Sequence, residues 1–199
     1  MSLPVSRDRI QSEIDHQLSE SAQVKREFAE CCSDAVIDVA ELLISAVHRQ
    51  QRILLCGNGG SAADAQHIAA ELVARLRKER RAIPALALST NTSTLTALAN
   101  DYDFSKVFVR QVEAFGSLGD VLIGISTSGN SENVLKAMVF AKQQGLKTVA
   151  LTGGSGGKMA AVADLSIIVP STSVQRIQEV HITVGHILCD LIEQSLNDQ

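Results

Sequence analysis

Five short apolar runs, separated by segments of helical periodicity, constrain this chain more than any other feature. The runs are continuous, as in strands buried on both faces of a sheet, and they cover 53–56, 85–88, 121–125, 148–151 and 165–169. The helical segments cover about 61–78, 92–100, 105–115, 131–144 and 157–163. Strands that alternate with helices form a parallel sheet with right-handed crossovers. The sequence therefore predicts an α/β fold, a flavodoxin-like three-layer sandwich around a five-stranded parallel sheet.

The segment before the first strand is typical of helices. Apolar residues recur about every four positions over 10–28 and again over 36–47. Ser33 and Asp34 lie between these stretches and are suitable caps for the second one. We expect two leading helices that cover the sheet or pack on another subunit.

The length and composition of the chain predict one domain. With 199 residues and 45% apolar content, the chain can bury one core and is short for two. We expect a helical part at 1–50 that serves packing or oligomerisation. The α/β core is expected at 51–199 and ends in a helix over about 175–196. These boundaries describe a single domain over 1–199.

Two turns rich in glycine and serine follow the first and third expected strands. They are Gly57-Asn58-Gly59-Gly60-Ser61 and Ser126-Thr127-Ser128-Gly129-Asn130-Ser131. Each ends a strand and opens a helix, so free N–H groups and the positive end of the helix dipole point outward. Neither turn contains lysine, which favours a sugar phosphate over a nucleoside triphosphate with its metal. Because ligands of parallel sheets bind at the carboxyl ends of the strands, we expect both turns to face one pocket.

Other interpretations of the glycine-rich loops are weaker. Gly57, Gly59 and Ala62 match a loose dinucleotide fingerprint, but the second strand ends without the acid that binds a ribose. The run 152–158 lacks the first Gly and the final Ser or Thr of a P-loop, so a flexible turn is the better explanation. The hydroxyls of 126–131 include a good helix cap, but a cap needs only one of them, and phosphate binding is favoured.

A second group of polar residues lies on two expected helices. His67 and Glu71 are four residues apart, so they share one face of a helix whose other residues are largely apolar. On the last helix, the face opposite the apolar stripe carries Gln178, His181, Gly185, His186 and Cys189. A histidine alone is more often packed or solvated than a ligand. This face of the last helix therefore meets either solvent or a site, and together with His67 and Glu71 its histidines favour a cluster of nitrogen and oxygen ligands.

Composition argues against several classes of function. A net charge of −4 with no basic block disfavours nucleic-acid binding, and the absence of Trp disfavours base stacking. No apolar run approaches the roughly 20 residues of a membrane span, and residues 1–4 lack the pattern of a signal peptide. The four cysteines form no C-x-x-C pair, as expected for thiols in a reducing compartment. We expect a cytoplasmic protein without nucleic-acid or membrane partners.

In these residues the chain resembles the phosphoheptose isomerases, a family of sugar-isomerase (SIS) domain proteins. The resemblance covers nearly the whole length, and its motifs are the two glycine–serine turns, His67 with Glu71, Asn100-Asp101, and Arg176-Ile177-Gln178-Glu179 with His186. It implies an isomerase that interconverts sedoheptulose 7-phosphate and D-glycero-D-manno-heptose 7-phosphate. It also implies a cytoplasmic homotetramer, with active sites at subunit contacts, that supplies heptose for bacterial surface polysaccharide such as lipopolysaccharide.

The resemblance also implies roles for individual residues. Substrate-binding positions are Asn58, Gly59, Gly60, Ser61, Glu71, Asn100, Asp101, Ser126, Thr127, Ser128, Ser131 and Gln178. One zinc ion per subunit is expected on His67, Glu71, Gln178 and His186. Glu71 is the candidate base and His186 the candidate acid for proton transfer between C1 and C2, or the zinc polarises the carbonyl. These two mechanisms compete for the same side chains.

One spacing in this ligand set creates a tension. Gln178 and His186 are eight residues apart, or about 12 Å along a straight helix. At that spacing the two side chains can just converge on one ion. Otherwise the helix begins irregularly near Gln178, or a second subunit supplies one ligand.

Rival functions on the same fold remain at this stage. One is a non-catalytic sugar-phosphate sensor or a replication-initiator-associating protein, which shares the serine turn but differs at the positions of Glu71 and His186. A second is an aldose–ketose isomerase for a pentose or hexose phosphate, and a third is a nicotinamide enzyme. Both Glu71 and His186 are present here, which favours the heptose isomerase.

Overall fold

The computed structural model describes residues 5–197 and contains a five-stranded sheet in the order β2-β1-β3-β4-β5. The strands are β1 Ile53–Gly57, β2 Ala85–Ala87, β3 Val121–Ile125, β4 Lys147–Gly153 and β5 Leu165–Val169. All neighbouring strands pair in parallel, which confirms the expected sheet. Residues 1–4, where the sequence lacks a signal-peptide pattern, lie outside the described part of the chain.

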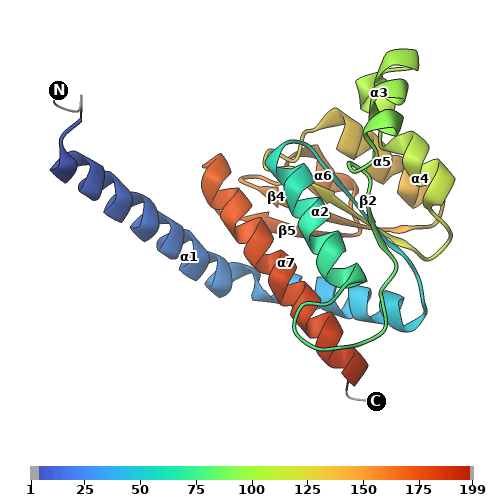
Figure 1. Ribbon diagram of the computed structural model, residues 1–199, viewed down its shortest axis with the longest axis horizontal. Helices are drawn as coiled ribbons and strands as arrows, with labels where there is room; N and C mark the ends of the chain where they lie inside the picture. Colours follow the sequence, from blue (N-terminus) through green and yellow to red (C-terminus); the bar gives the residue numbers. More distant parts are fainter. Residues whose placement is uncertain (1–4, 198–199) are drawn as a thin grey trace.

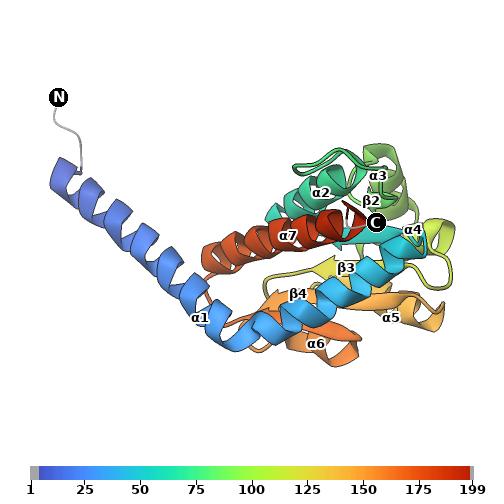
Figure 2. The same ribbon diagram turned by 90° about the horizontal axis from the view of Figure 1, so that it is seen from below.

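Helices cover both faces of the sheet, giving three layers (Figures 1 and 2). Alternate side chains of a strand point to opposite faces. Ile53 and Leu55 of β1 therefore pack in one core, whose helices are α1 Arg7–His48, α2 Gly60–Val73 and α7 Val174–Asn197. Leu54 and Cys56 pack in the other core. The second layer comprises α3 Thr92–Asp101, the 3-10 helix η1 Phe104–Lys106, α4 Val109–Phe115, α5 Glu132–Gln143 and α6 Gly157–Val162.

The leading segment is one helix, α1, rather than the two expected helices. Ser33 does not cap a second helix, because its hydroxyl donates to the carbonyl of Ala29 at 2.7 Å within the same helix. Such back-bonding bends helices, and α1 bends where its dark blue half meets its lighter half (Figure 2). The first half extends away from the sheet and exposes Ile14 and Leu18, whereas the second half buries Leu43. Within residues 5–197, neither α1 nor any other helix has the apolar length to cross a membrane.

Two other helix boundaries differ from the sequence prediction. Helix α2 ends at Val73 rather than near residue 78, because the carboxylate of Glu193 on α7 binds the backbone N–H groups that would continue it. The helix expected over 105–115 is split into η1 and α4, since Asp103 accepts the N–H of Ser105 and starts a 3-10 turn. The remaining helices lie close to their expected ranges.

The strand order places both glycine–serine turns at one point. The strand that follows β1 in the chain, β2, lies on one side of the β1–β3 pair, and the strand that follows β3, β4, lies on the other side. The switch point of the sheet therefore lies between β1 and β3. Gly57, the last residue of β1, pairs in register with Ile125, the last residue of β3. The two turns thus leave the same edge of the sheet side by side, as the sequence predicted.

Candidate active site

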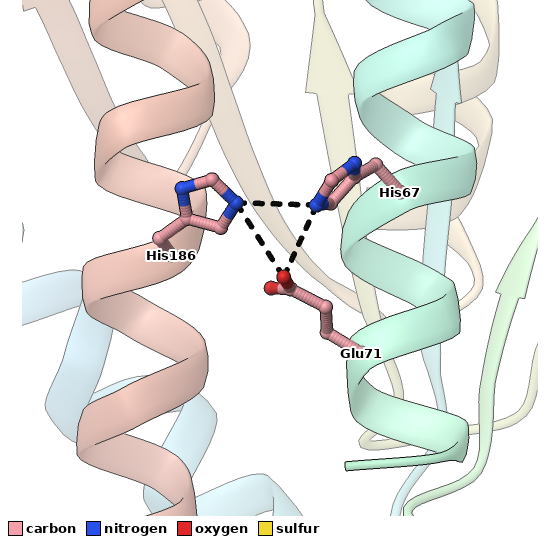
Figure 3. Close-up of side chains that lie close together, drawn as sticks. All are labelled: His67, Glu71 and His186. Atoms are coloured by element: carbon pink, nitrogen blue, oxygen red, sulfur yellow. Dashed lines mark hydrogen bonds and ion pairs between the residues drawn. The ribbon is translucent and has the colours of Figure 1, made fainter. Parts of the chain in front are cut away.

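Three side chains from two helices meet on the outer surface of the α2–α7 pair (Figure 3). His67 and Glu71 lie one turn apart on α2, and His186 reaches them from α7. His67 Nε2 lies 3.1 Å from Glu71 Oε1 and 3.1 Å from His186 Nε2. The His186 Nε2 to Glu71 Oε1 distance is 3.4 Å. We call His67, Glu71 and His186 the trio.

No protonation state of the neutral rings satisfies all three contacts of the trio, since a ring nitrogen carries either a hydrogen or a lone pair. With hydrogens on both facing nitrogens, the two N–H groups oppose each other. When only one of the two facing nitrogens carries a hydrogen, the lone pair of the other nitrogen faces the carboxylate oxygen and is repelled by it. A cation between three lone pairs satisfies all of them, and nitrogen and oxygen ligands at 2.0–2.1 Å from tetrahedral zinc are about 3.3 Å apart. The donor atoms of the trio therefore fit a divalent ion such as zinc.

Burial differs sharply within the trio. The side chains of His67 and His186 are 52% and 45% exposed, whereas that of Glu71 is 15% exposed. Glu71 Oε2 is buried, with the Cys189 thiol nearby. Burial raises the pKa of the nearby Cys189 thiol, and the charge of Glu71 raises it further, so this thiol stays neutral. The trio offers two accessible imidazoles over a sheltered carboxylate.

The serine turn presents hydroxyls that its helix does not use. Ser131 is the N-cap residue of α5, yet within the described helix its side chain bonds no N–H of the first turn. Its hydroxyl instead pairs with that of Ser126 at 2.8 Å, and Ser128 lies 3.5 Å from Ser126. Gly129 adopts a φ of +64° and lies so close to the backbone of Gly156 that a Cβ has no room. The surplus of donors at a helix start favours anion binding over capping alone.

A cavity of about 280 Å³ opens beside the serine turn. Its lining comes from the carboxyl ends of β3 and β4, the segment after β5 and the first turns of α7: Thr127, Ser128, Gly153, Gly154, Ser155, Ser171, Thr172, Val174 and Ile177. From the sequence, residues 152–158 are expected to form only a flexible turn, and residues 171–172 have no expected role. The position of both segments after expected strands was the signal that they line the same edge.

The first glycine turn links the serine turn to α7. The amides of Asn58 and Asn133 exchange two hydrogen bonds of 2.9 Å, which ties this turn to the start of α5. Gly59 has a φ of +55°, and Ser61 is buried. A Cβ at Gly60 would lie 2.3 Å from Gln178 Nε2, so the absence of a side chain there makes room for that amide.

Known proteins resemble this chain in both sequence and fold. The family model of the SIS domain matches residues 17–153. The phosphoheptose isomerase of Aquifex aeolicus is 57% identical over 175 residues, which cover 88% of this chain and 92% of that protein. The chain belongs to the phosphoheptose isomerase family. Two solved phosphoheptose isomerases have the same fold. That of Neisseria gonorrhoeae matches with a TM-score of 0.88 and 43% identity, covering 93% of this chain and 99% of that one. That of Francisella tularensis matches with a TM-score of 0.89 and 38% identity, covering 92% of this chain and 98% of that one.

Not all residues that the family resemblance implied lie together in this chain. Gln178 lies against Gly60 in the first turns of α7, about 12 Å along the helix from His186. Asn100 and Asp101 end α3, on the opposite face of the sheet from α2 and α7, where the Asn100 amide donates to the Asp101 carboxylate at 2.8 Å.

Two residues of the α7 face that was expected to meet solvent or a site, His181 and Cys189, are buried instead. Cys189 is buried where α7 packs on α2, at the point where a Cβ at Gly185 would lie 2.7 Å from Ile68 Cδ1. His181 is buried against β4. His181 Nε2 lies 3.1 Å from the Thr152 carbonyl oxygen, and burial lowers the pKa of this histidine to about 4. Ile187, an apolar residue next to His186 on the same helix, is 43% exposed. Only Gln178 and His186 of this face remain candidates for the phosphoheptose isomerase reaction.

Proposed function

We propose that this chain interconverts sedoheptulose 7-phosphate and D-glycero-D-manno-heptose 7-phosphate. The observation that carries this proposal is the meeting of His67, Glu71 and His186 on helices that begin beside the phosphate-binding turns. High identity to named phosphoheptose isomerases supports the same substrate class. The chain acts, in this proposal, as one SIS domain over 1–199, with 1–50 serving assembly and 51–199 forming the core.

The phosphate end of the sugar is assigned to the serine turn. Ser126, Thr127, Ser128 and Ser131 offer hydroxyls, and the start of α5 offers free N–H groups, with Asn58 to Ser61 on the adjacent turn. Helix α7, which carries His186 of the trio, begins at the cavity beside this turn, where Val174 and Ile177 line it. Binding energy at the phosphate can therefore position C1 and C2 near the trio.

The trio is assigned to the chemistry at C1 and C2. Isomerisation moves a proton between the two carbons and a second proton between their oxygens. Glu71 takes the carbon-bound proton, and His186 exchanges protons with the oxygens. His67, Glu71 and His186, with Gln178 of a neighbouring copy as a fourth ligand, would hold one zinc ion per subunit, which when bound would act as a Lewis acid toward the carbonyl. Because the two roles use the same lone pairs, Glu71 is a weaker base wherever it binds an ion.

Assembly and location complete the proposal. The half-exposed histidines of the trio and the exposed apolar residues Ile10, Ile14 and Leu18 on α1 support a homotetramer whose sites are shared between subunits. Asn100 and Asp101 then belong to a neighbouring copy's substrate site. A cytoplasmic enzyme that supplies heptose for lipopolysaccharide, with neither nucleic acid nor membrane as partner, is consistent with these features. The alternative of a non-catalytic sensor or replication partner is not favoured, because Glu71 and His186 are present and meet.

A substrate panel tests the proposal. Purified protein is incubated with sedoheptulose 7-phosphate and, in parallel, with pentose and hexose ketose phosphates, and the aldose formed is quantified. The proposal expects turnover of the heptulose phosphate at least about tenfold faster than of the shorter sugars. Preferred turnover of a shorter sugar would assign a different substrate, and absence of all turnover would leave only a binding function.

A further inference from the structure

A buried ion pair lies just behind the trio. Arg80, in the loop after α2, and Glu193, on α7, have side chains only 3% and 2% exposed, with Arg80 Nε 3.5 Å from Glu193 Oε2. Glu193 lies seven residues beyond His186, so both are on one side of α7. The pair therefore joins the two helices that carry the trio. We call Arg80 and Glu193 the clamp.

Glu193 holds the loop that follows α2. Its carboxylate accepts the backbone N–H groups of Leu76 at 3.0 Å, Arg77 at 2.9 Å and Lys78 at 2.6 Å. Burial alone raises the pKa of Glu193, but these N–H groups and the Arg80 charge outweigh it and keep this pKa below the usual range. Hydrogen bonds to a charged acceptor are about twice as strong as neutral ones. The carboxylate thus fixes the loop to α7.

Arg80 holds the end of α2 itself. Its guanidinium donates to the carbonyl oxygens of Glu71 at 2.8 Å and of Leu72 at 2.8 Å, and more weakly to that of Ala74 at 3.3 Å. These carbonyls have no partner further along the helix, which ends at Val73. The backbone of Glu71, a member of the trio, is thereby bound directly by the clamp.

A second close contact fixes the α2–α7 distance at the level of the trio. Gly185, next to His186, faces Ile68, next to His67, with no room for a Cβ. One contact point lets two helices pivot, whereas two points along the helices define both their separation and their angle. The clamp supplies the second point, two turns of α7 beyond the first.

We propose that Arg80 and Glu193 are positioning residues of the active centre, which tie the end of α2 to α7 and so set the distances within the trio. The inference rests on the proposed function only in taking the trio as a site for a divalent ion. Neither clamp residue belongs to the group of side chains that could hold the ion. The clamp acts through the backbone of Glu71 and through the helix that carries His186.

Cobalt(II) titration of metal-free protein tests the clamp. Bound Co²⁺ is followed by its visible absorption, in wild type and in Glu193→Gln. Loss of a residue that supports metal ligands costs about 10- to 100-fold in metal affinity, and we expect this loss together with an altered absorption spectrum. In the isomerase assay, kcat falls while KM changes less than about twofold, since the phosphate turn is untouched.

The matched control is Asp164→Asn, at the far edge of the sheet. Asp164 also accepts backbone and side-chain hydrogen bonds from Thr148 and pairs with Lys142, so its loss lowers stability without touching α2 or α7. This variant is expected to keep the cobalt affinity of wild type. Equal losses in Asp164→Asn and Glu193→Gln would reduce the clamp to a general stabilising pair and overturn the proposal.

A conservative variant keeps the proposal testable if Glu193→Gln does not fold. Arg80→Lys keeps the positive charge beside Glu193 but cannot span the carbonyls of Glu71 and Leu72, and we expect about tenfold weaker cobalt binding. Wild-type cobalt affinity and spectrum in a folded clamp variant would overturn the proposal while leaving the isomerase function intact. Conversely, weakened cobalt binding in a chain whose wild type turns over no heptose phosphate would support the clamp and refute the proposed function.

Discussion

Replacement of Ser131 by alanine separates phosphate binding from helix capping. Because the Ser131 hydroxyl pairs with Ser126 at 2.8 Å and bonds no N–H of its own described helix, its loss costs one neutral hydrogen bond. That loss is worth about 0.5–1.5 kcal/mol of unfolding free energy. A hydrogen bond to a charged phosphate is worth about 1.5–3 kcal/mol, which corresponds to about 10- to 150-fold weaker binding of sedoheptulose 7-phosphate.

The companion variant Ser131→Gly makes this test decisive. Glycine is nearly as good a helix cap as serine, within a few tenths of a kcal/mol, whereas alanine is poor. If Ser131 binds phosphate, both variants lose affinity to the same degree in calorimetric titration with the sugar phosphate. If Ser131 were only a cap, Ser131→Gly would retain the stability of wild type in urea denaturation and both variants would bind the sugar normally. That second pattern would refute the assignment of the serine turn.

Three further predictions concern the ion, the first glycine turn and a buried histidine. Elemental analysis is expected to find about one zinc per chain, and dialysis against a chelator is expected to lower heptose-phosphate turnover until zinc is restored; unchanged turnover of the zinc-free protein would assign catalysis to free Glu71 and His186 alone. Gly60→Ala is expected to displace the Gln178 amide and so to lower turnover by up to about 100-fold. In urea denaturation, the unfolding free energy should stay unchanged or rise by up to about 1 kcal/mol. Unimpaired turnover would remove Gln178 from the site. Burial lowers the pKa of His181 from 6.5 to about 4 in the folded state, so only the unfolded chain gains a proton as the pH falls between these values. The unfolding free energy of wild type should therefore fall by about 3 kcal/mol relative to that of His181→Gln between pH 6.5 and pH 4. A constant difference between the two proteins in urea denaturation across this range would contradict the burial of a neutral ring.

The sheet could be predicted from the sequence because each central strand is buried on both faces. All five residues of β1 and all five of β3 are buried, so their sequences are continuous apolar runs with sharp ends. The glycine–serine turns after them mark the carboxyl edge. Strand order then brings the two turns together at the switch point, as for other parallel sheets.

The extents of α1 and α2 could not be predicted, because they depend on choices that local sequence leaves open. Ser33 is equally suited to cap a new helix or to bond back to Ala29, and only the second occurs. Helix α2 has no strong stop signal after Val73. Its end is set by Glu193, which is remote in sequence and reaches the loop only after α7 packs on α2.

The trio was predictable to the extent that its spacing is local. His67 and Glu71 are four residues apart and so share one face of a helix. His186 lies on the face of the last helix opposite its apolar stripe, which made it a candidate ligand, and it meets Glu71 in the structure. Cys189, three residues from His186, lies within about 60° of it around the helix, so periodicity does not separate these two. His181, five residues from His186, is turned by about 140° and faces β4. The close approach of Gly185 to Ile68 decides which of these side chains are buried between the helices.

The most direct test of the role of the trio replaces Glu71 by glutamine and His186 by alanine and measures turnover and sugar binding on the same samples. Each change is expected to lower isomerisation of sedoheptulose 7-phosphate by about 100- to 10,000-fold, while calorimetric binding of the sugar phosphate remains measurable because the serine turn is intact. Turnover near that of wild type in either variant would contradict the assignment of the reaction to the trio.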